Sequence, residues 1–498
     1  METLFYKMIY DKQLKRSMAS LEILYRAKHN ITIKELGQHL GVSRKTVLTT
    51  LEFTKTLLPK TISLSVEENN IELINNSTHA IETALIEVAQ KTSSFQILEH
   101  AFLNKGLNIH ELAEKLFISV SALSARIRHI SAVLSVFNCS LSYYDLQFIG
   151  NEADIRYFGY TYFSEFQELY LSACKERLPC CVNIYTNMKR ELEEHDSKLM
   201  NFCYQQVTKM LLVTRDRLSA GKTIQIADSF VKRIYNRPSY QYFRDVYKRE
   251  LSHHLDEAII TEAEIVWAYV SSFKFIIYFS SDDRALYRDE EDVQDIKKKT
   301  TKFLNKMADT LNIHDADKDD FLLTHMAYLI NKSLLTEISP IFQLGSSAVR
   351  DYIFNNSGNL YTAWYDSLSS VGEDELFPIH NIESMSTQLA MISSQFLYLQ
   401  KAQATKVLYS FEGESGFAVY LETLAKTLLP KGVEGVFIYN EPITSTLIEQ
   451  IQPDIIVYNY EPQEIITNCK ALVMSFIPQI QEWTLLKELI INLNYNFS

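Results

Sequence analysis

The residues best suited to chemistry lie at the start of an amphipathic stretch near the N-terminus. They combine two cations with neighbouring hydroxyl groups: Ser43, Arg44, Lys45, Thr46 and Thr49. Arginine and lysine match the acceptor atoms of guanine, and a serine hydroxyl can donate to a phosphate. Such side chains at the N-terminus of a helix in the major groove contact base edges directly. This chemistry is recognition of double-stranded DNA and not catalysis.

A second segment repeats the first one without gaps. The stretch ITIKELGQHLGVSRKTVLTTLEFTKTLL, from Ile31, aligns with LNIHELAEKLFISVSALSARIRHISAVL, from Leu107. In the second copy the residues placed to contact DNA are Ser121, Ser124, Arg126 and Arg128. The surroundings of this copy are acidic. Base recognition, backbone binding and a role as a spacer therefore all remain open for it.

Each copy has the pattern of a helix-turn-helix, which is the element that would position these side chains. In the first copy Thr32 and Glu35 have the spacing of a capping box, and Gly41 falls where the turn needs a positive φ. The segments ISLSVEENNIELI and CSLSYYDLQFIG, one after each copy, predict β-wings. In the second copy the helix cap is Asn108. Phe117 replaces the turn glycine, so that turn must be strained or differently built.

The charge of the chain is distributed unevenly. The formal net charge is −12, which taken alone argues against a general polyanion binder. Residues 1–60, however, hold 11 Lys and Arg against 5 Asp and Glu, which gives +6. Residues 61–160 hold 6 against 11. Only the N-terminal segment has the electrostatic sign for nucleic acid, so we expect DNA binding to reside mainly in the first copy.

Glycine is scarce and unevenly placed, which indicates the fold class. Of the 13 glycines, only Gly221 lies between Tyr160 and Pro340, so this stretch is expected to be almost entirely helical. From residue 406 short apolar runs alternate with amphipathic segments, which predicts an α/β domain with a mainly parallel sheet. No Gly-rich phosphate loop occurs. The six cysteines form no C-x-x-C pair, which is typical of reduced thiols in a cytosolic protein.

The order of these segments resembles the Mga/AtxA family of transcriptional (virulence) regulators across essentially the whole chain. That family has two winged helix-turn-helix domains, two all-α PRD modules (phosphotransferase-regulated domains) and a C-terminal α/β domain similar to a sugar-phosphotransferase EIIB component. The resemblance implies a multi-domain, mainly α fold. Its expected domains are winged helix-turn-helix domains at 1–75 and 76–158, PRD-like bundles at 159–280 and 281–398, and an EIIB-like domain at 399–498.

His325 carries the resemblance in the second helical module. PRD modules present a phosphorylatable histidine within a helix that reads like LLTHMAYLINKSL in this chain. The resemblance implies that His325 accepts phosphate from the histidine phosphocarrier protein, and the added charge would change how the bundles pack or dimerise. The competing interpretation is a histidine that only packs between helices. Two positions expected to hold histidine in the first module are Lys209 and Ser271, so three of the four histidines typical of the family are absent or unplaced.

The C-terminal domain lacks the nucleophile of its counterpart. EIIB components carry a cysteine just after the first strand, but the stretch from Tyr409 to Gly413 has none. Serine cannot replace a low-pKa thiolate without activation, so phosphoryl transfer is not expected here. The resemblance suggests an oligomerisation surface or a ligand sensor instead.

These observations predict a cytoplasmic transcription regulator that binds promoter DNA, and the resemblance implies that it is a homodimer. We expect no enzymatic activity, no cofactor, no metal site and no membrane segment. RNA polymerase and the phosphocarrier protein are the further expected partners. The alternatives are a sugar-operon activator phosphorylated on its PRD modules, an RNA-binding antiterminator, and an enzyme that uses the C-terminal domain. RNA readers usually present aromatic sheets or KH loops, so the helix-turn-helix pair argues against the antiterminator.

Overall fold

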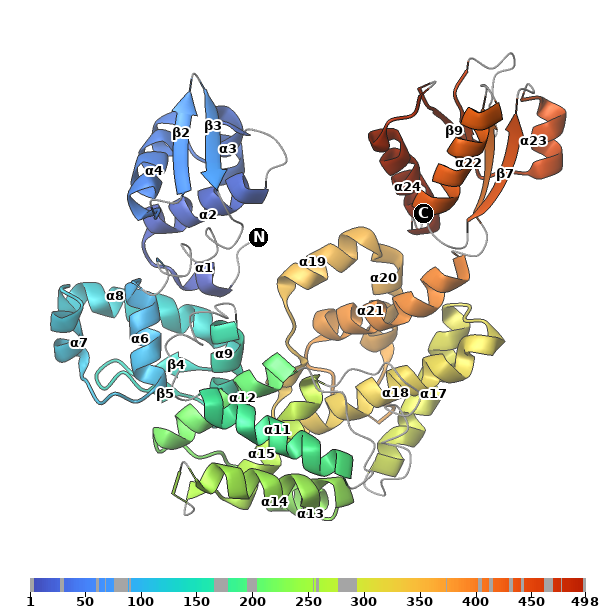
Figure 1. Ribbon diagram of the computed structural model, residues 1–498. Coiled ribbons are helices and arrows are strands. Elements are labelled where there is room, and N and C mark those ends of the chain that lie inside the picture. The colour runs from blue at the N-terminus through green and yellow to red at the C-terminus, as the bar shows by residue number, and fades with distance from the viewer. Residues whose placement is uncertain are drawn as a thin grey trace. The chain divides into compact units, whose positions relative to one another are not determined.

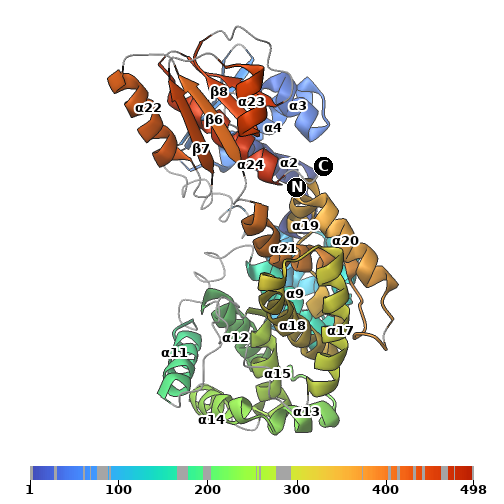
Figure 2. The same ribbon diagram turned by 90° about the vertical axis from the view of Figure 1, so that its right-hand side faces the viewer.

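The computed structural model divides into two compact units, each described below by itself (Figures 1 and 2). One unit is Met1–Gln294 with Ile330–Phe342, and the other is Asp295–Leu329 with Gln343–Ser498. The structure describes residues 4–26, 31–59, 62–67, 69–75, 88, 91–164, 178–194, 204–253, 255–256, 259–275, 293–372, 374–401, 405–411, 415–429, 433–439, 443–460, 469–475 and 477–495.

The first winged domain is a three-helix bundle closed by an antiparallel sheet (Figure 1). Its elements are α2 (Lys12–Arg26), β1 (Ile31–Thr32), α3 (Ile33–Leu40), α4 (Arg44–Leu57), β2 (Ile62–Glu67) and β3 (Asn70–Asn75). The predicted capping box is confirmed, because the Glu35 N–H donates to the Thr32 hydroxyl and the Thr32 N–H donates to the Glu35 carboxylate at 2.8 Å. Val47 and Leu51 are fully buried on the inner face of α4, so the opposite face is left to solvent.

The second winged domain repeats this arrangement with a much smaller wing. Its elements are α6 (Ser93–Phe102), α7 (Ile109–Lys115), α8 (Val120–Leu134), η1 (Ser135–Phe137), β4 (Ser140–Leu141) and β5 (Phe148–Ile149). Asn108 forms the expected capping box with Glu111. By length and composition, one stretch among the described residues, Val120–Phe137, is apolar enough to cross a membrane. Within it, Leu123 and Ile127 are buried in the core of this domain.

The first described helix, α1, packs on the second winged domain. α1 (Leu4–Met8) contacts α8, and Met8 is fully buried. The Ser94 hydroxyl on α6 donates to the Met8 carbonyl at 2.6 Å. Within the range 1–75 predicted for the first winged domain, α1 thus contacts the neighbouring domain, whereas α2 contacts α3 and α4.

The two helix-turn-helix turns have the same hydrogen bonds, although one has glycine and the other phenylalanine at the critical position. Gly41 has a φ of 63° and Phe117 a φ of 54°. In each turn the residue after this position donates to the carbonyl five residues earlier at 3.0 Å, which is the Schellman arrangement. The second turn is therefore built in the same way as the first, and it is strained. A left-handed conformation costs roughly 1–2 kcal/mol for a residue with a Cβ.

The first helical bundle follows directly from the second winged domain. Its elements are α9 (Glu152–Ser164), α11 (Leu178–Glu194), α12 (Tyr204–Ser219), α13 (Asp228–Tyr235), α14 (Pro238–Ser252), α15 (Glu262–Ser272) and η3 (Phe273–Phe275). Trp267 on α15 lies at its centre, where the indole N–H donates to the buried Thr214 hydroxyl at 3.0 Å. The helical character predicted from the missing glycines is confirmed for the described part of this stretch.

The second helical bundle forms its own core around Trp364. Its elements are α17 (Gln294–Thr310), α18 (Asp315–Ile338), η5 (Pro340–Gln343), α19 (Ser347–Asn356), α20 (Gly358–Ser370) and α21 (Ile382–Lys401). Phe321 on α18, Leu389 on α21 and Leu304 on α17 are all fully buried in this core. The last turns of α18, from residue 330 onward, belong to the other compact unit.

The C-terminal domain is a parallel sheet with helices on both faces (Figure 2). Its elements are β6 (Lys406–Phe411), α22 (Ser415–Leu428), β7 (Glu434–Tyr439), α23 (Ser445–Ile451), β8 (Ile455–Tyr458), β9 (Lys470–Val473) and α24 (Ile480–Tyr495). The strand order is β7-β6-β8-β9, and every neighbouring pair is parallel. Along β6 Tyr409 faces the core with α22 and α24, whereas Leu408 faces the core with α23. The predicted parallel sheet is confirmed.

We predict that Phe117→Gly stabilises the second winged domain by about 1 kcal/mol. Glycine removes the left-handed strain, and the 95% exposed phenylalanine side chain has no buried packing to lose. The reciprocal Gly41→Phe should destabilise the first winged domain through backbone strain alone, because a Cβ at Gly41 meets nothing within 4 Å. Hydrogen exchange of α8 and α4 measures both changes. Faster exchange of the α8 amides in Phe117→Gly than in the wild type would show that the turn is not strained.

Candidate nucleic-acid interface

The predicted DNA-contacting residues of the first winged domain lie together at the start of α4. Ser43 is the N-cap, and its hydroxyl accepts from the Thr46 N–H and lies 3.0 Å from the Thr46 hydroxyl. Arg44 and Lys45 are both exposed. The Thr49 hydroxyl donates to the Lys45 carbonyl at 3.0 Å and is exposed one turn further along. The structure thus presents all five predicted residues on the solvent side of the domain.

The wing orients one of these cations, which the sequence alone did not indicate. Arg44 Nη1 donates to Asn69 Oδ1 at 2.7 Å. Asn69 lies in the turn between β2 and β3, so the hydrogen bond joins the start of α4 to the tip of the wing. The only sequence signal for this contact was the Glu-Glu-Asn-Asn turn of the wing. A guanidinium held in this way loses less side-chain freedom on binding, which favours recognition.

In the second winged domain the predicted residues separate into different environments. Ser121 is exposed, and its hydroxyl is 2.9 Å from that of the cap residue Ser119. Arg128 is exposed as well. Ser124, however, is only 4% exposed: its hydroxyl donates to the Val120 carbonyl and lies 2.6 Å from the Tyr143 hydroxyl. Ser124 therefore ties α8 to the wing and is not available for base contact.

Arg126 is committed to intramolecular contacts. Its Nη1 donates to the Ala122 carbonyl at 3.2 Å, and its guanidinium lies over the Tyr10 ring at 5.5 Å from the centroid. His129 also meets Tyr10 edge-on, and its Nε2 is 2.8 Å from the Lys7 carbonyl. The N-terminal segment thus covers this side of α8. Of the four residues predicted in this copy, Ser121 and Arg128 remain exposed.

A buried ionic cluster lies in the first helical bundle, next to the second winged domain. Glu152 and Arg156 on α9, Arg217 on α12 and Glu264 on α15 form it, and both guanidinium groups are almost fully buried. Arg156 binds both carboxylate oxygens of Glu264 at 2.7 and 3.0 Å. Arg217 binds both oxygens of Glu152 at 2.8 and 2.7 Å. Two cations therefore meet two anions in bidentate geometry, the arrangement in which buried charges are tolerated.

The same cluster reaches directly into the second winged domain. Arg217 Nη1 donates to the carbonyl of Phe102, the last residue of α6, at 2.8 Å, and the guanidinium lies over the Phe102 ring. Lys222 Nζ donates to the Gln147 side chain next to the wing at 2.8 Å. Gly159 on α9 permits this close contact, because a Cβ there would lie 2.4 Å from the Phe102 ring. The second winged domain is therefore anchored on the first helical bundle, which is called the helical body below.

The predicted phosphate acceptor His325 is completely buried. Its Nδ1 lies 2.8 Å from the Phe321 carbonyl, and its Nε2 lies 2.8 Å from the Ser393 hydroxyl. The Phe321 carbonyl can only accept, so the imidazole proton is on Nδ1 and Nε2 accepts from the Ser393 hydroxyl. The Trp364 indole N–H donates to the same hydroxyl at 2.9 Å. The imidazole also stacks on Trp364, with the ring centroids 5.4 Å apart. Both nitrogens are therefore engaged, and the ring is not accessible to a phosphocarrier protein in this arrangement.

The environment of His325 keeps it neutral. Burial lowers the pKa of this imidazole to about 4, although the nearby Phe321 carbonyl acts in the opposite direction. The corresponding position of the first bundle, Lys209, is buried, and so is Ser271. This geometry agrees with the packing role that was the competing interpretation.

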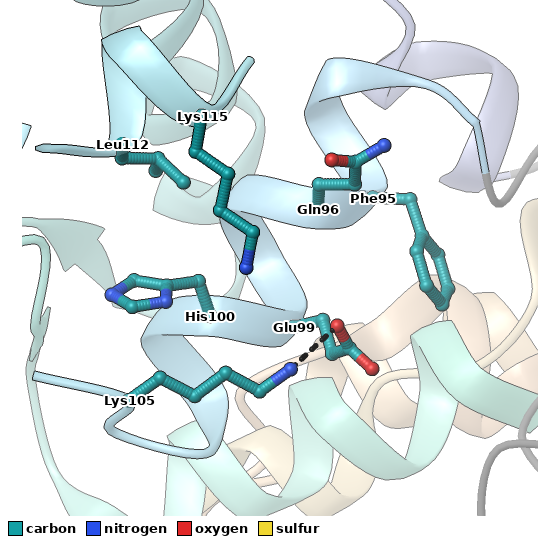
Figure 3. A pocket seen from close by; sticks show the side chains of 7 residues that line it. All are labelled: Phe95, Gln96, Glu99, His100, Lys105, Leu112 and Lys115. Atoms are coloured by element: carbon teal, nitrogen blue, oxygen red, sulfur yellow. Dashed lines mark hydrogen bonds and ion pairs between the residues drawn. The ribbon is translucent and has the colours of Figure 1, made fainter. Parts of the chain in front are cut away.

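A shallow pocket of about 260 Å³ lies between α6 and α7 of the second winged domain (Figure 3). Lys115 points into it, while Lys105 at its edge forms an ion pair with Glu99 at 2.8 Å. Burial lowers the pKa of His100, whose Nδ1 is closed to solvent. Since one carboxylate neutralises one of the two ammonium groups, we assign no ligand to this pocket.

The first strand of the C-terminal domain ends without a nucleophile. The Ser410 hydroxyl is buried and lies 2.7 Å from the Tyr460 hydroxyl. Residues 412–414, which continue the stretch that the sequence analysis compared with EIIB, lie outside the described residues. The described part of this strand end shows no thiol.

Comparison with known proteins identifies helix-turn-helix domains at both positions. Residues 16–58 match a helix-turn-helix domain family, and residues 74–163 match the Mga helix-turn-helix domain. A protein of Streptococcus pneumoniae serotype 4 that carries the name trans-acting regulator is 25% identical over 68% of this chain and 69% of its own length. The Bacillus anthracis capsule synthesis positive regulator AcpA is 19% identical over 69% of this chain and 71% of its own length. The capsule synthesis positive regulator AcpB of the same organism is 26% identical over 29% of this chain and 30% of its own length.

We predict that acidification destabilises the second helical bundle through His325. The imidazole has a pKa of about 4 in the folded state and about 6.5 when unfolded, so the unfolded chain binds the proton more tightly. Stability is therefore fully present above pH 6.5 and falls by about 3 kcal/mol as the pH drops to 4. Hydrogen exchange of α18, corrected for the intrinsic effect of pH, measures this loss. The control is His325→Gln, and an equal loss in that variant would refute the assignment to His325.

Proposed function

Since this chain is homologous to the Mga-type transcription regulators and carries their helix-turn-helix domains, we propose that it binds double-stranded promoter DNA chiefly through α4 of the first winged domain. The observation that carries the proposal is the exposed group of Arg44 and Lys45 at the N-terminus of that helix. A helix of this kind enters the major groove with its first residues against the bases. Ser43, Thr46 and Thr49 complete the surface with hydroxyl groups that can contact phosphates or bases.

The second winged domain takes a different part in this proposal. Its helix α8 begins with Val120, Ser121 and Ala122, which carry no charge, and Arg126 is held against Tyr10. Arg128 and Ser121 remain for contact with the DNA backbone or bases. Because this domain is anchored on the helical body, it is the natural route by which a change in that body reaches the DNA.

We extend the proposal to regulation at His325 in a form that its burial requires. Transfer of phosphate from the histidine phosphocarrier protein needs α18 and α21 to separate first, since Ser393 and Trp364 cover the imidazole. A phosphate there, with nearly two negative charges, would then prevent the helices from closing again. Phosphorylation would thus hold an open form of the second bundle.

Mass spectrometry of the chain incubated with phosphorylated carrier protein tests this regulation. We expect slow labelling of His325 in the wild type and faster labelling in Trp364→Ala, which removes the ring that covers it. Equal rates would show that Trp364 does not gate the site. A complete lack of labelling in both proteins would show that His325 is not an acceptor.

The remaining partners belong to the same proposal. We propose a homodimer formed through the C-terminal domain, supported by the exposed Val419 and Tyr420 on α22 of that domain. Light scattering of the full chain measures this association. RNA polymerase at the promoter is the further partner that the family resemblance suggests. No enzymatic role is proposed, since the buried Ser410 is not placed as a nucleophile. These activities place the protein with the DNA, in the cytoplasm.

The cations of α4 provide the direct test of DNA binding. We predict that Arg44→Ala with Lys45→Ala weakens binding at least tenfold and makes it less dependent on salt, because two phosphate- or base-contacting charges are lost. The matched control is Arg126→Ala with Arg128→Ala, which removes the same charge from α8 and should cost less. Titration of a duplex selected by the full chain from a random-sequence pool measures both variants.

The reverse order of the two double variants would place the main contact in the second winged domain. Binding of matched single-stranded RNA in preference to the duplex would favour an antiterminator instead.

A further inference from the structure

Phe117 is unfavourable for the folded protein on two separate counts. Its φ of 54° places a side chain with a Cβ in the left-handed region, which glycine occupies at the equivalent position of the first winged domain. Its ring is 95% exposed, the largest exposure among the large apolar side chains of the described residues. Within the described part of the chain, no contact of Phe117 offsets either the backbone strain or the exposure of its ring. We therefore expect Phe117 to contact a binding partner of the domain.

The position of Phe117 indicates that this partner is DNA. It lies two residues before Ser119, the N-cap of α8, and the hydrogen bond from the Ile118 N–H to the Ala113 carbonyl fixes the turn at this place. The first turn of such a helix is the part that reaches into the major groove. A side chain that projects from the turn just before this helix lies at the edge of the same groove.

The chemistry of the group it would meet follows from the side chain. A phenyl ring offers no hydrogen bond, so it cannot recognise the polar edges of guanine, adenine or cytosine. The one apolar group in the major groove is the C5-methyl of thymine, and phenylalanine is among the side chains that contact it. Ser119 and Ser121, which follow Phe117 in the sequence, are neutral hydroxyl residues, and the start of α8 lacks the cations of α4.

We propose that Phe117 is a specificity-determining residue that contacts a thymine methyl group in the major groove beside α8. The second winged domain thus recognises bases by apolar contact, whereas the first uses Arg44 and Lys45. This inference rests on the proposed DNA binding and adds to it a base preference for the second domain. Among the described residues of that domain, Phe117 is the side chain best placed for an apolar base contact.

The stability of the test variant makes the experiment sharp. Phe117→Gly relieves backbone strain, so weaker DNA binding by this variant cannot be caused by a loss of folding. The matched control is Val136→Ala, which shortens an exposed apolar side chain, 60% exposed, that follows α8 at its other end. This control should leave DNA binding unchanged.

The experiment measures coupling between the ring and the methyl group. Duplexes are selected from a random-sequence pool with the full wild-type chain, and each thymine is then replaced by deoxyuridine, which lacks only the methyl. At one thymine we expect the replacement to weaken wild-type binding about fourfold, as expected for one buried methyl group. Phe117→Gly should bind the thymine duplex about as weakly as the wild type binds the deoxyuridine duplex. The variant should not distinguish the two bases.

Three outcomes separate the claims. A thymine whose replacement weakens the wild type and not Phe117→Gly supports the inference. Methyl removal that affects both proteins equally at every position, or that affects neither protein, overturns the inference while leaving the proposed DNA binding intact. Failure of the full chain to select any duplex overturns the proposed function itself.

Discussion

The buried ionic cluster at the start of α9 determines how the DNA-binding half of the molecule meets its helical body. Isolated buried charges cost several kcal/mol each, so these four side chains are acceptable only when all of them are paired. Arg156 and Glu264 pair within the helical bundle, and Arg217 and Glu152 pair beside the second winged domain. Because Arg217 also binds the Phe102 carbonyl, the end of α6 cannot move independently of α12. Any rearrangement of the bundle must therefore displace α6 or break the cluster.

The two winged domains use their corresponding surfaces differently, although their sequences repeat. The first presents Arg44 and Lys45 to solvent and has the wing residue Asn69 to orient one of them. The second uses its equivalent surface partly for internal contacts, with Ser124 bound to Tyr143 and Arg126 covered by Tyr10. The proposal assigns DNA binding chiefly to the basic first domain and communication with the first helical bundle to the second. We expect the acidic remainder of the chain to limit its non-specific attachment to DNA.

Features governed by neighbouring residues could be predicted from the sequence. The capping boxes of Thr32 and Asn108 depend on residues three positions away, and the parallel sheet follows from alternating segment patterns. The burial of Ser124 could not be predicted, because its partner Tyr143 lies 19 residues further along. The cover over Arg126 comes from Tyr10, more than a hundred residues away. The ionic cluster also joins residues from three helices, and only tertiary packing brings them together. His325 was found by its motif, but its burial depends on Trp364 and Ser393.

The most direct test of this account maps which helix lies in the groove. An iron chelate attached to Leu48→Cys on α4, or to Ser121→Cys on α8, cleaves DNA strands close to its point of attachment. Labelled wild-type chain corrects for the native cysteines. On a duplex selected by the full chain, the account predicts sharp cleavage at a defined position from the α4 site, and weaker cleavage from α8. Cleavage from the α8 site alone would contradict the assignment of the first winged domain as the main DNA-binding element.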